Sequence, residues 1–235
     1  NYRFFDRLKT SKMFLDNMRR LGIYEIYPEE VEFRFTELFY VNSILGAISQ
    51  FDPSVSHITA KDACFRFYRD VRFREDKRPY KDHFGAYISA HGRKSLHAGY
   101  YIHLQPEACL VSAGAYWLPT NILTSCRNEI MGNIDEWRKC VDNGKFINLF
   151  GYPNEGDWEK HNGKGFGLTH LKTSPKGFPR DYEFIEYLKM KDYACWKYVT
   201  DDYYEGDGWL ENVVDIFKTA KPMMDFMNNV IDDYE

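Results

Sequence analysis

The spacing of apolar residues changes near Lys61, and this change constrains the fold more than any other feature of the sequence. Between positions 28 and 51 the apolar side chains recur about every 3.6 residues, which is typical of an amphipathic helix. From Phe65 to Phe73 apolar and polar side chains alternate, which predicts a strand with one buried face. The same patterns predict further strands at 84–90, 99–105, 108–116 and 193–199, and helices at 4–20, 119–143, 181–191 and 215–230. Adjacent strands between flanking helices predict an α+β fold with a mainly antiparallel sheet.

The chain is expected to form a single domain over residues 1–235. No Pro/Gly/Ser-rich linker divides it, and no repeat of about 20–50 residues occurs. The segment from Gly151 to Gly167 is the richest in glycine and is interpreted as a long surface loop. Such a loop is expected to be the first site of limited proteolysis.

Cysteine usage and the distribution of apolar residues favour a cytoplasmic protein that does not enter a membrane. Five cysteines lie far apart with no C-x-x-C pair, so reduced thiols fit better than a disulfide framework or a zinc knuckle. Residues 1–20 carry charges throughout, unlike a signal peptide. The longest uncharged stretch, 108–126, contains Pro119 and several polar residues and is not expected to span a bilayer.

Charge is distributed unevenly along the chain. The whole sequence has 31 Lys and Arg against 35 Asp and Glu, a net charge of −4. Residues 61–94 hold ten basic and five acidic side chains, net +5, which leaves −9 for the remainder. The overall sign makes nucleic acid an improbable partner. The basic segment either faces an anionic ligand or is neutralised by the acidic C-terminal part of the chain.

Residues 66–85 are the part of the sequence with the densest chemistry. If 65–73 is a strand, Arg66, Asp70 and Arg72 share one face, and paired guanidinium groups there would suit a phosphate or a carboxylate. The alternative is a solvated face with cross-strand ion pairs. Arg69 lies on the opposite, apolar face and is expected to form a buried structural ion pair, because an unpaired buried charge is costly.

The residues after the predicted strand complete a candidate site. Lys77 and Tyr80 are expected to close over a ligand held by Arg66 and Arg72. Asp70 or His83 would transfer protons. A histidine at position 97 or 103 is expected at the wall of the same polar cavity. No metal site is predicted, since the sequence has no H-E-x-x-H or H-x-H pattern.

The pattern R-x-x-R-D-x-R-F-x-x-D-K-x-x-Y resembles the signature of a bacterial family of conserved hypothetical proteins, domain-of-unknown-function family 2461. The matching residues are Arg66, Arg69, Asp70, Arg72, Phe73, Asp76, Lys77 and Tyr80. The resemblance continues through Gly92-Arg93-Lys94 and Ala98-Gly99-Tyr100-Tyr101 and covers roughly positions 51–178. It implies a bacterial, soluble, single-domain protein and supplies no activity, substrate or cofactor.

Two classes of function therefore stay open at the level of the sequence. The first is an enzyme or binding protein for an anionic small molecule, with the cofactor unknown. The second is a non-catalytic interaction module that docks an acidic partner or, less readily, nucleic acid. A deep pocket beside the arginines would favour the first class, and a flat exposed face the second.

Overall fold

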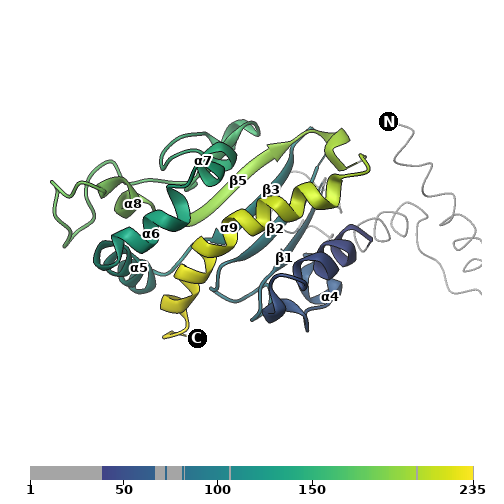
Figure 1. The fold of residues 1–235 in the computed structure, drawn as a ribbon, viewed down its shortest axis with the longest axis horizontal. Helices are drawn as coiled ribbons and strands as arrows, with labels where there is room; N and C mark the ends of the chain where they lie inside the picture. The colour runs from purple at the N-terminus through teal and green to yellow at the C-terminus, as the bar shows by residue number, and fades with distance from the viewer. Residues whose placement is uncertain are drawn as a thin grey trace, which may run out of the picture.

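A computed structural model describes residues 39–66, 72, 81, 83–105, 107–204 and 206–234. These residues form an α+β fold around a five-stranded antiparallel sheet with the order β1-β2-β3-β5-β4 (Figure 1). The strands are β1 (Phe84–Ile88), β2 (Gly99–Leu104), β3 (Cys109–Ala115), β4 (Lys164–Phe166) and β5 (Tyr193–Val199). The fold class expected from the sequence is confirmed.

Helices precede the sheet, connect its strands and follow it. The described α-helices are a helix over 39–48, α4 (Ala60–Ala63), α5 (Thr120–Gly132), α6 (Ile134–Val141), α7 (Gly144–Phe150), α8 (Ile185–Lys189) and α9 (Trp209–Ile231). Three short 3₁₀ turns lie at Pro53–Val55, Trp158–Lys160 and Asp201–Tyr204.

The core lies between the sheet and α9, which crosses one face of the strands (Figure 1). Side chains along β2 point alternately to the two faces of the sheet, so every second one faces the core. The Tyr100 ring packs on Phe217 of α9 with 4.9 Å between ring centroids, while Tyr101 belongs to the opposite face. The apolar side chains along one face of α9 are buried against the sheet, and this burial drives the docking of the helix. None of the described helices is long and apolar enough to cross a membrane.

Most of the elements expected from the sequence form within a few residues of their predicted bounds. Strands β1, β2, β3 and β5 are confirmed, and the helical region 119–143 is divided into α5 and α6 at Asn133. The described part of the first predicted helical region, 39–48, is helical, whereas the predicted helix at 4–20 lies outside the described residues. The Gly151–Gly167 loop contains a strand that was not predicted, β4, which pairs with β5.

The prediction of a strand over 65–73 is wrong at the residues that the structure describes. Phe65 and Arg66 lie outside any strand, and Arg72 lies in a turn. Two backbone contacts join this part of the chain to β1: an isolated bridge from Cys64 to Ala86, and a hydrogen bond from the Phe65 N–H to the Gly85 carbonyl, at 2.9 Å. The ladder ends there, so the alternation of arginines does not place Arg66 and Arg72 side by side on one strand face.

Candidate functional site

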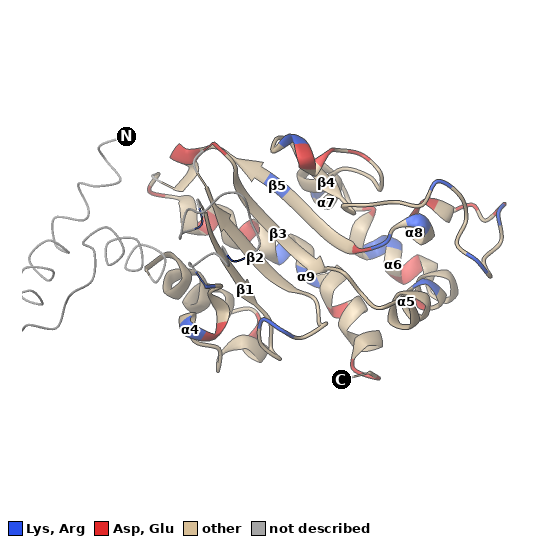
Figure 2. Ribbon diagram, turned by 180° about the vertical axis from the view of Figure 1, so that it is seen from behind, with Lys and Arg blue, Asp and Glu red and all other residues tan. Residues whose placement is uncertain are grey.

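The face of the sheet opposite α9 carries a floor of small side chains at its centre. Gly99 of β2 is paired with Gly114 of β3, which is paired with Ala194 of β5. The next row on the same face contains Ser112 of β3. In Figure 2, seen from this side, the strands lie in front of α9. A cavity of about 630 Å³ lies over this floor.

Aromatic rings lie flat across the glycines of this face. A Cβ atom on Gly99 would be 2.8 Å from Tyr87 Cζ, and one on Gly165 would be 2.3 Å from the Trp196 indole. A Cβ atom on Gly85 would be 2.9 Å from the Tyr101 hydroxyl. Glycine is needed at these positions because only a residue without a side chain lets a neighbouring ring approach the backbone so closely. The rings consequently border the cavity instead of filling it.

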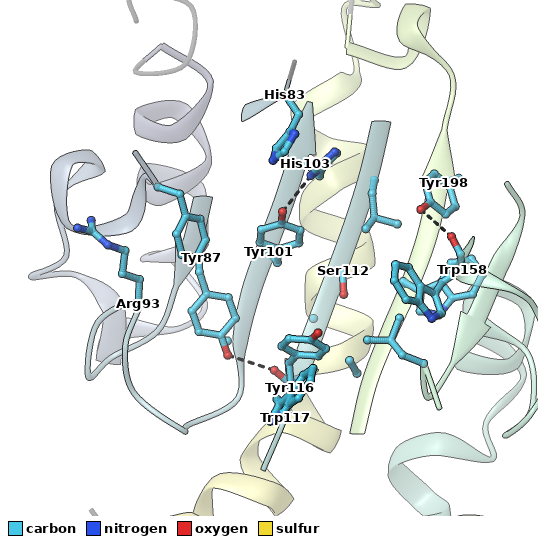
Figure 3. A pocket seen from close by; sticks show the side chains of 18 of the residues that line it. His83, Tyr87, Arg93, Tyr101, His103, Ser112, Tyr116, Trp117, Trp158 and Tyr198 are labelled. Atoms are coloured by element: carbon cyan, nitrogen blue, oxygen red, sulfur yellow. Dashed lines mark hydrogen bonds between the residues drawn. The ribbon is translucent and has the colours of Figure 1, made fainter. Parts of the chain in front are cut away.

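Further aromatic residues from loops and from β5 form the walls. Tyr116 and Trp117 follow β3 and pack edge to face, with 5.8 Å between their ring centroids. On the opposite side, the Tyr198 hydroxyl donates a hydrogen bond of 3.0 Å to the Trp158 carbonyl (Figure 3). Trp117 is 77% exposed and has φ 56°, a left-handed conformation that is uncommon for a bulky residue. The surrounding chain holds this large apolar side chain at the cavity mouth at a cost in backbone strain.

A hydrogen-bonded chain of polar side chains lies at the His83 end of the cavity. The Tyr101 hydroxyl is 3.0 Å from His103 Nδ1, and His103 Nε2 is 2.9 Å from Gln105 Oε1. Both contacts are satisfied when Tyr101 donates to Nδ1 and the Nε2 proton is donated to Gln105. Burial raises the pKa of Tyr101 to about 12, so its phenol stays protonated and acts as a donor at neutral pH. The His83 ring stacks on His103 at 4.5 Å.

The lining contains a buried donor without a partner and little charge. Trp196 is 1% exposed, and its indole Nε1 has no hydrogen-bond partner among the described residues. Arg93 is the only lysine or arginine among the described lining residues. Its Nη1 donates to the carbonyl oxygens of residues 61, 62 and 64 at 2.8–2.9 Å, so this nitrogen is directed to the end of α4. The lining residues that the structure describes therefore suit an uncharged aromatic group better than a bare anion.

The structure brings together only part of the site predicted from the sequence. His83 lines the cavity, and His103 does so as well. Arg66 and Arg72 are exposed and do not belong to the lining. The remaining predicted residues, Arg69, Asp70, Lys77 and Tyr80, lie outside the described residues, so the ion pair of Arg69 and the roles of the other three stay predictions.

His97 lies behind the cavity and not at its wall. It is 3% exposed and stacks on His91 at 3.9 Å, with 5° between the ring planes. The nitrogen and oxygen atoms of His91, His97 and Asp232 lie within 4.8 Å of one another, the spacing of metal ligands. The lone pairs of two stacked imidazoles lie in parallel planes and do not converge on one point, so these three side chains as arranged do not present a metal-binding geometry.

Most of the lining residues were not predicted from the sequence. The cavity forms where residues have no side chain, and in the sequence this is visible only as glycines within strands. The missed lining residues include Tyr87, Tyr101, Ser112, Trp117, Trp158, Trp196 and Tyr198. Glycines inside the predicted strands, such as Gly99 and Gly114, were the available signal, since a glycine in a strand often marks the close approach of another group.

Comparison with known proteins gives one match. The family model for conserved hypothetical proteins named DUF2461 matches residues 26–226. No curated protein matches the chain, and no solved structure matches it.

Proposed function

The chain belongs to the DUF2461 family of conserved hypothetical proteins, and because that description carries no activity, we propose a function from the cavity itself. The protein binds a small planar molecule that is largely aromatic. One observation carries the proposal: a cavity of about 630 Å³ lies over a floor of small residues and is walled by aromatic rings, among them the buried indole of Trp196.

The size and the lining of the cavity support this class of ligand. Small-molecule pockets are typically clefts of about 300–1,000 Å³ with apolar walls and a few placed polar groups. Offset-stacked and edge-to-face contacts with Tyr87, Trp117 and Trp158 would hold a flat ring.

The anionic ligand predicted from the basic segment remains the second candidate. The chain passes from Phe65 to His83 through the basic segment, and both residues line the cavity. An aromatic ligand with an acidic substituent would unite the two ideas, with Arg66 and Arg72 as the predicted anion-binding groups. A cytoplasmic location, which would give such a protein access to soluble metabolites, stays a prediction.

Two fluorescent probes separate these candidates. N-phenyl-1-naphthylamine is a neutral aromatic molecule, and 1-anilinonaphthalene-8-sulfonate is the same molecule with an anionic group. The proposal predicts saturable enhancement of N-phenyl-1-naphthylamine fluorescence by the native protein. If an anion site adjoins the cavity, the sulfonate should bind more tightly, with a preference that falls with added salt and is lost in Arg72→Ala.

A matched pair of variants at Ser112 provides the control. Ser112→Leu puts a branched side chain on the cavity floor and should weaken probe binding by about tenfold or more, or about 1.4 kcal/mol. Ser112→Ala removes the hydroxyl without filling the space and should bind the neutral probe like the native protein. Equal binding by the native protein and Ser112→Leu would contradict the proposal.

A further inference from the structure

Three side chains form a hydrogen-bonded chain that begins with the hydroxyl of Ser95 at the cavity lining. Ser95 Oγ is 2.8 Å from His97 Nδ1, and His97 Nε2 is 2.7 Å from Asp232 Oδ1. Ser95 and His97 lie in the connection between β1 and β2, whereas Asp232 follows the end of α9. The buried imidazole of His97 is thus hydrogen-bonded to a carboxylate 135 positions further along the chain.

The positions of the hydrogen atoms follow from the neighbouring donors. The His97 backbone N–H donates to Ser95 Oγ at 3.0 Å, so the hydroxyl already accepts one bond and can direct its own proton to Nδ1. The Asp232 carboxylate is an acceptor, which keeps the imidazole proton on Nε2. Nδ1 is then the unprotonated nitrogen facing the hydroxyl, which is the arrangement that activates a serine for nucleophilic attack.

The hydroxyl and the imidazole of this chain differ in their access to the cavity. Ser95 belongs to the cavity lining, whereas His97 does not and is 3% exposed. Ser112 also lines the cavity, but its hydroxyl donates to the Cys195 carbonyl at 2.8 Å and has no such base. The cavity therefore offers two serines that differ in the group receiving the hydroxyl proton, which makes Ser112 a natural control.

We propose that Ser95 is a nucleophile for acyl transfer from an ester whose aromatic part occupies the cavity, with His97 as general base and Asp232 as its positioning residue. Ser95 Oγ forms a bond to the ester carbonyl carbon while its proton moves to His97 Nδ1. The same proton then passes to the departing alcohol oxygen as the carbon–oxygen bond breaks. Water repeats the sequence and releases the acid. The substrate class rests on the proposed function, because the cavity selects the aromatic group.

A fluorophosphonate probe tests the nucleophile in the full-length protein. Attack of Ser95 Oγ would form an oxygen–phosphorus bond and expel fluoride, with the proton taken up by His97. Peptide mass spectrometry should find the adduct on Ser95 and none on Ser112, whose hydroxyl donates its proton to a carbonyl oxygen. His97→Gln should slow labelling by about 100-fold, the lower range for a lost general base. Asp232→Asn should slow labelling without changing the affinity for N-phenyl-1-naphthylamine.

A second measurement covers the case in which His97→Gln fails to fold. In Ser95→Cys the same base would draw a proton from the new thiol, so iodoacetamide should modify position 95 faster than position 112 in Ser112→Cys. Absence of an adduct on Ser95 in the folded native protein, or equal alkylation of the two cysteine variants, overturns the proposal.

The two proposals fail separately. Probe binding without labelling removes the nucleophile and keeps the aromatic cavity. Labelling of Ser95 without binding of N-phenyl-1-naphthylamine keeps the nucleophile and removes the aromatic selectivity.

Discussion

At the scale of single residues, the site depends on glycines that make room for rings. Gly99 shows this most directly, since a Cβ atom there would meet the Ile88 carbonyl at 2.6 Å and the Tyr87 ring at 2.8 Å. The carbonyl is backbone and cannot move aside. Tyr87 is itself fixed, because its hydroxyl donates to the His97 carbonyl at 2.7 Å.

Gly99→Ala is therefore expected to lower the free energy of unfolding by about 1–3 kcal/mol, the usual cost of overpacking. Urea denaturation followed by circular dichroism measures this. Gly46→Ala is the control, because Gly46 lies in the helix over 39–48 with no atom within 4 Å of the added methyl group. That variant should be as stable as the native protein or up to about 1 kcal/mol more stable. Equal behaviour of the two variants would contradict the packing argument.

At the scale of elements, Arg93 connects α4 to the β1–β2 connection. Its Nη1 donates to three carbonyl oxygens at the end of a four-residue helix, where carbonyls have no partner within the helix. The helix begins with a capping box at Thr59 and Asp62, so its two ends are stabilised in different ways.

Arg93→Gln should loosen α4 selectively. Amide hydrogen exchange at residues 62–64 is expected to quicken, while the amides of β2 and β3 keep their protection. Because the substitution removes charge-assisted hydrogen bonds, it should lower the free energy of unfolding by about 1.5–3 kcal/mol. Arg138→Gln breaks an exposed pair with Asp142 within α6 and its C-cap and should change stability by at most about 1 kcal/mol. Uniform acceleration across the sheet in Arg93→Gln would argue against a local role.

Helices and strands whose apolar residues recur with a regular period were predictable from the sequence. Elements whose position depends on tertiary contacts were not. Strand β5 has the predicted bounds, because its apolar residues lie in the interior of the sheet. The alternation at 65–73 resembles a strand equally well, yet Phe65 makes one backbone hydrogen bond to β1 and neither Phe65 nor Arg66 belongs to a strand. Of the predicted site, His83 and the predicted wall residue His103 are placed in the cavity lining by the described residues. The aromatic walls come from loops and β5, which no local pattern connects to β2 and β3.

At the scale of the whole molecule, buried tyrosines couple folding to alkaline pH. Burial raises the pKa of Tyr101 and Tyr203 to about 12 and raises the pKa of Tyr87, Tyr187 and Tyr193 further. A tyrosine whose folded pKa exceeds its unfolded value of about 10 keeps its proton in the native state and loses it in the unfolded state. Its contribution is complete below pH 10 and is lost as the pH rises through the folded pKa.

Stability should accordingly fall steeply above about pH 10, by on the order of 1.4 kcal/mol per pH unit for each such tyrosine. Urea unfolding at pH 8, 10 and 11, with phenolate absorbance recorded in parallel, measures both the loss and its cause. A protein equally stable at pH 8 and pH 11, or one whose tyrosines ionise before it unfolds, would contradict this picture of the core.

The central claim is that the cavity on the sheet face opposite α9 holds an aromatic ligand, and the five tryptophans test it in one spectrum. Trp117, Trp158 and Trp196 line the cavity, whereas Trp137 and Trp209 are buried in the core. The ¹H–¹⁵N correlation signals of the five indole N–H groups are recorded during titration with N-phenyl-1-naphthylamine and assigned by single Trp→Phe variants. The account predicts that the three lining signals shift in a saturable manner while the two core signals stay in place. Five unmoved signals, or core signals that shift as far as the lining ones, would contradict it.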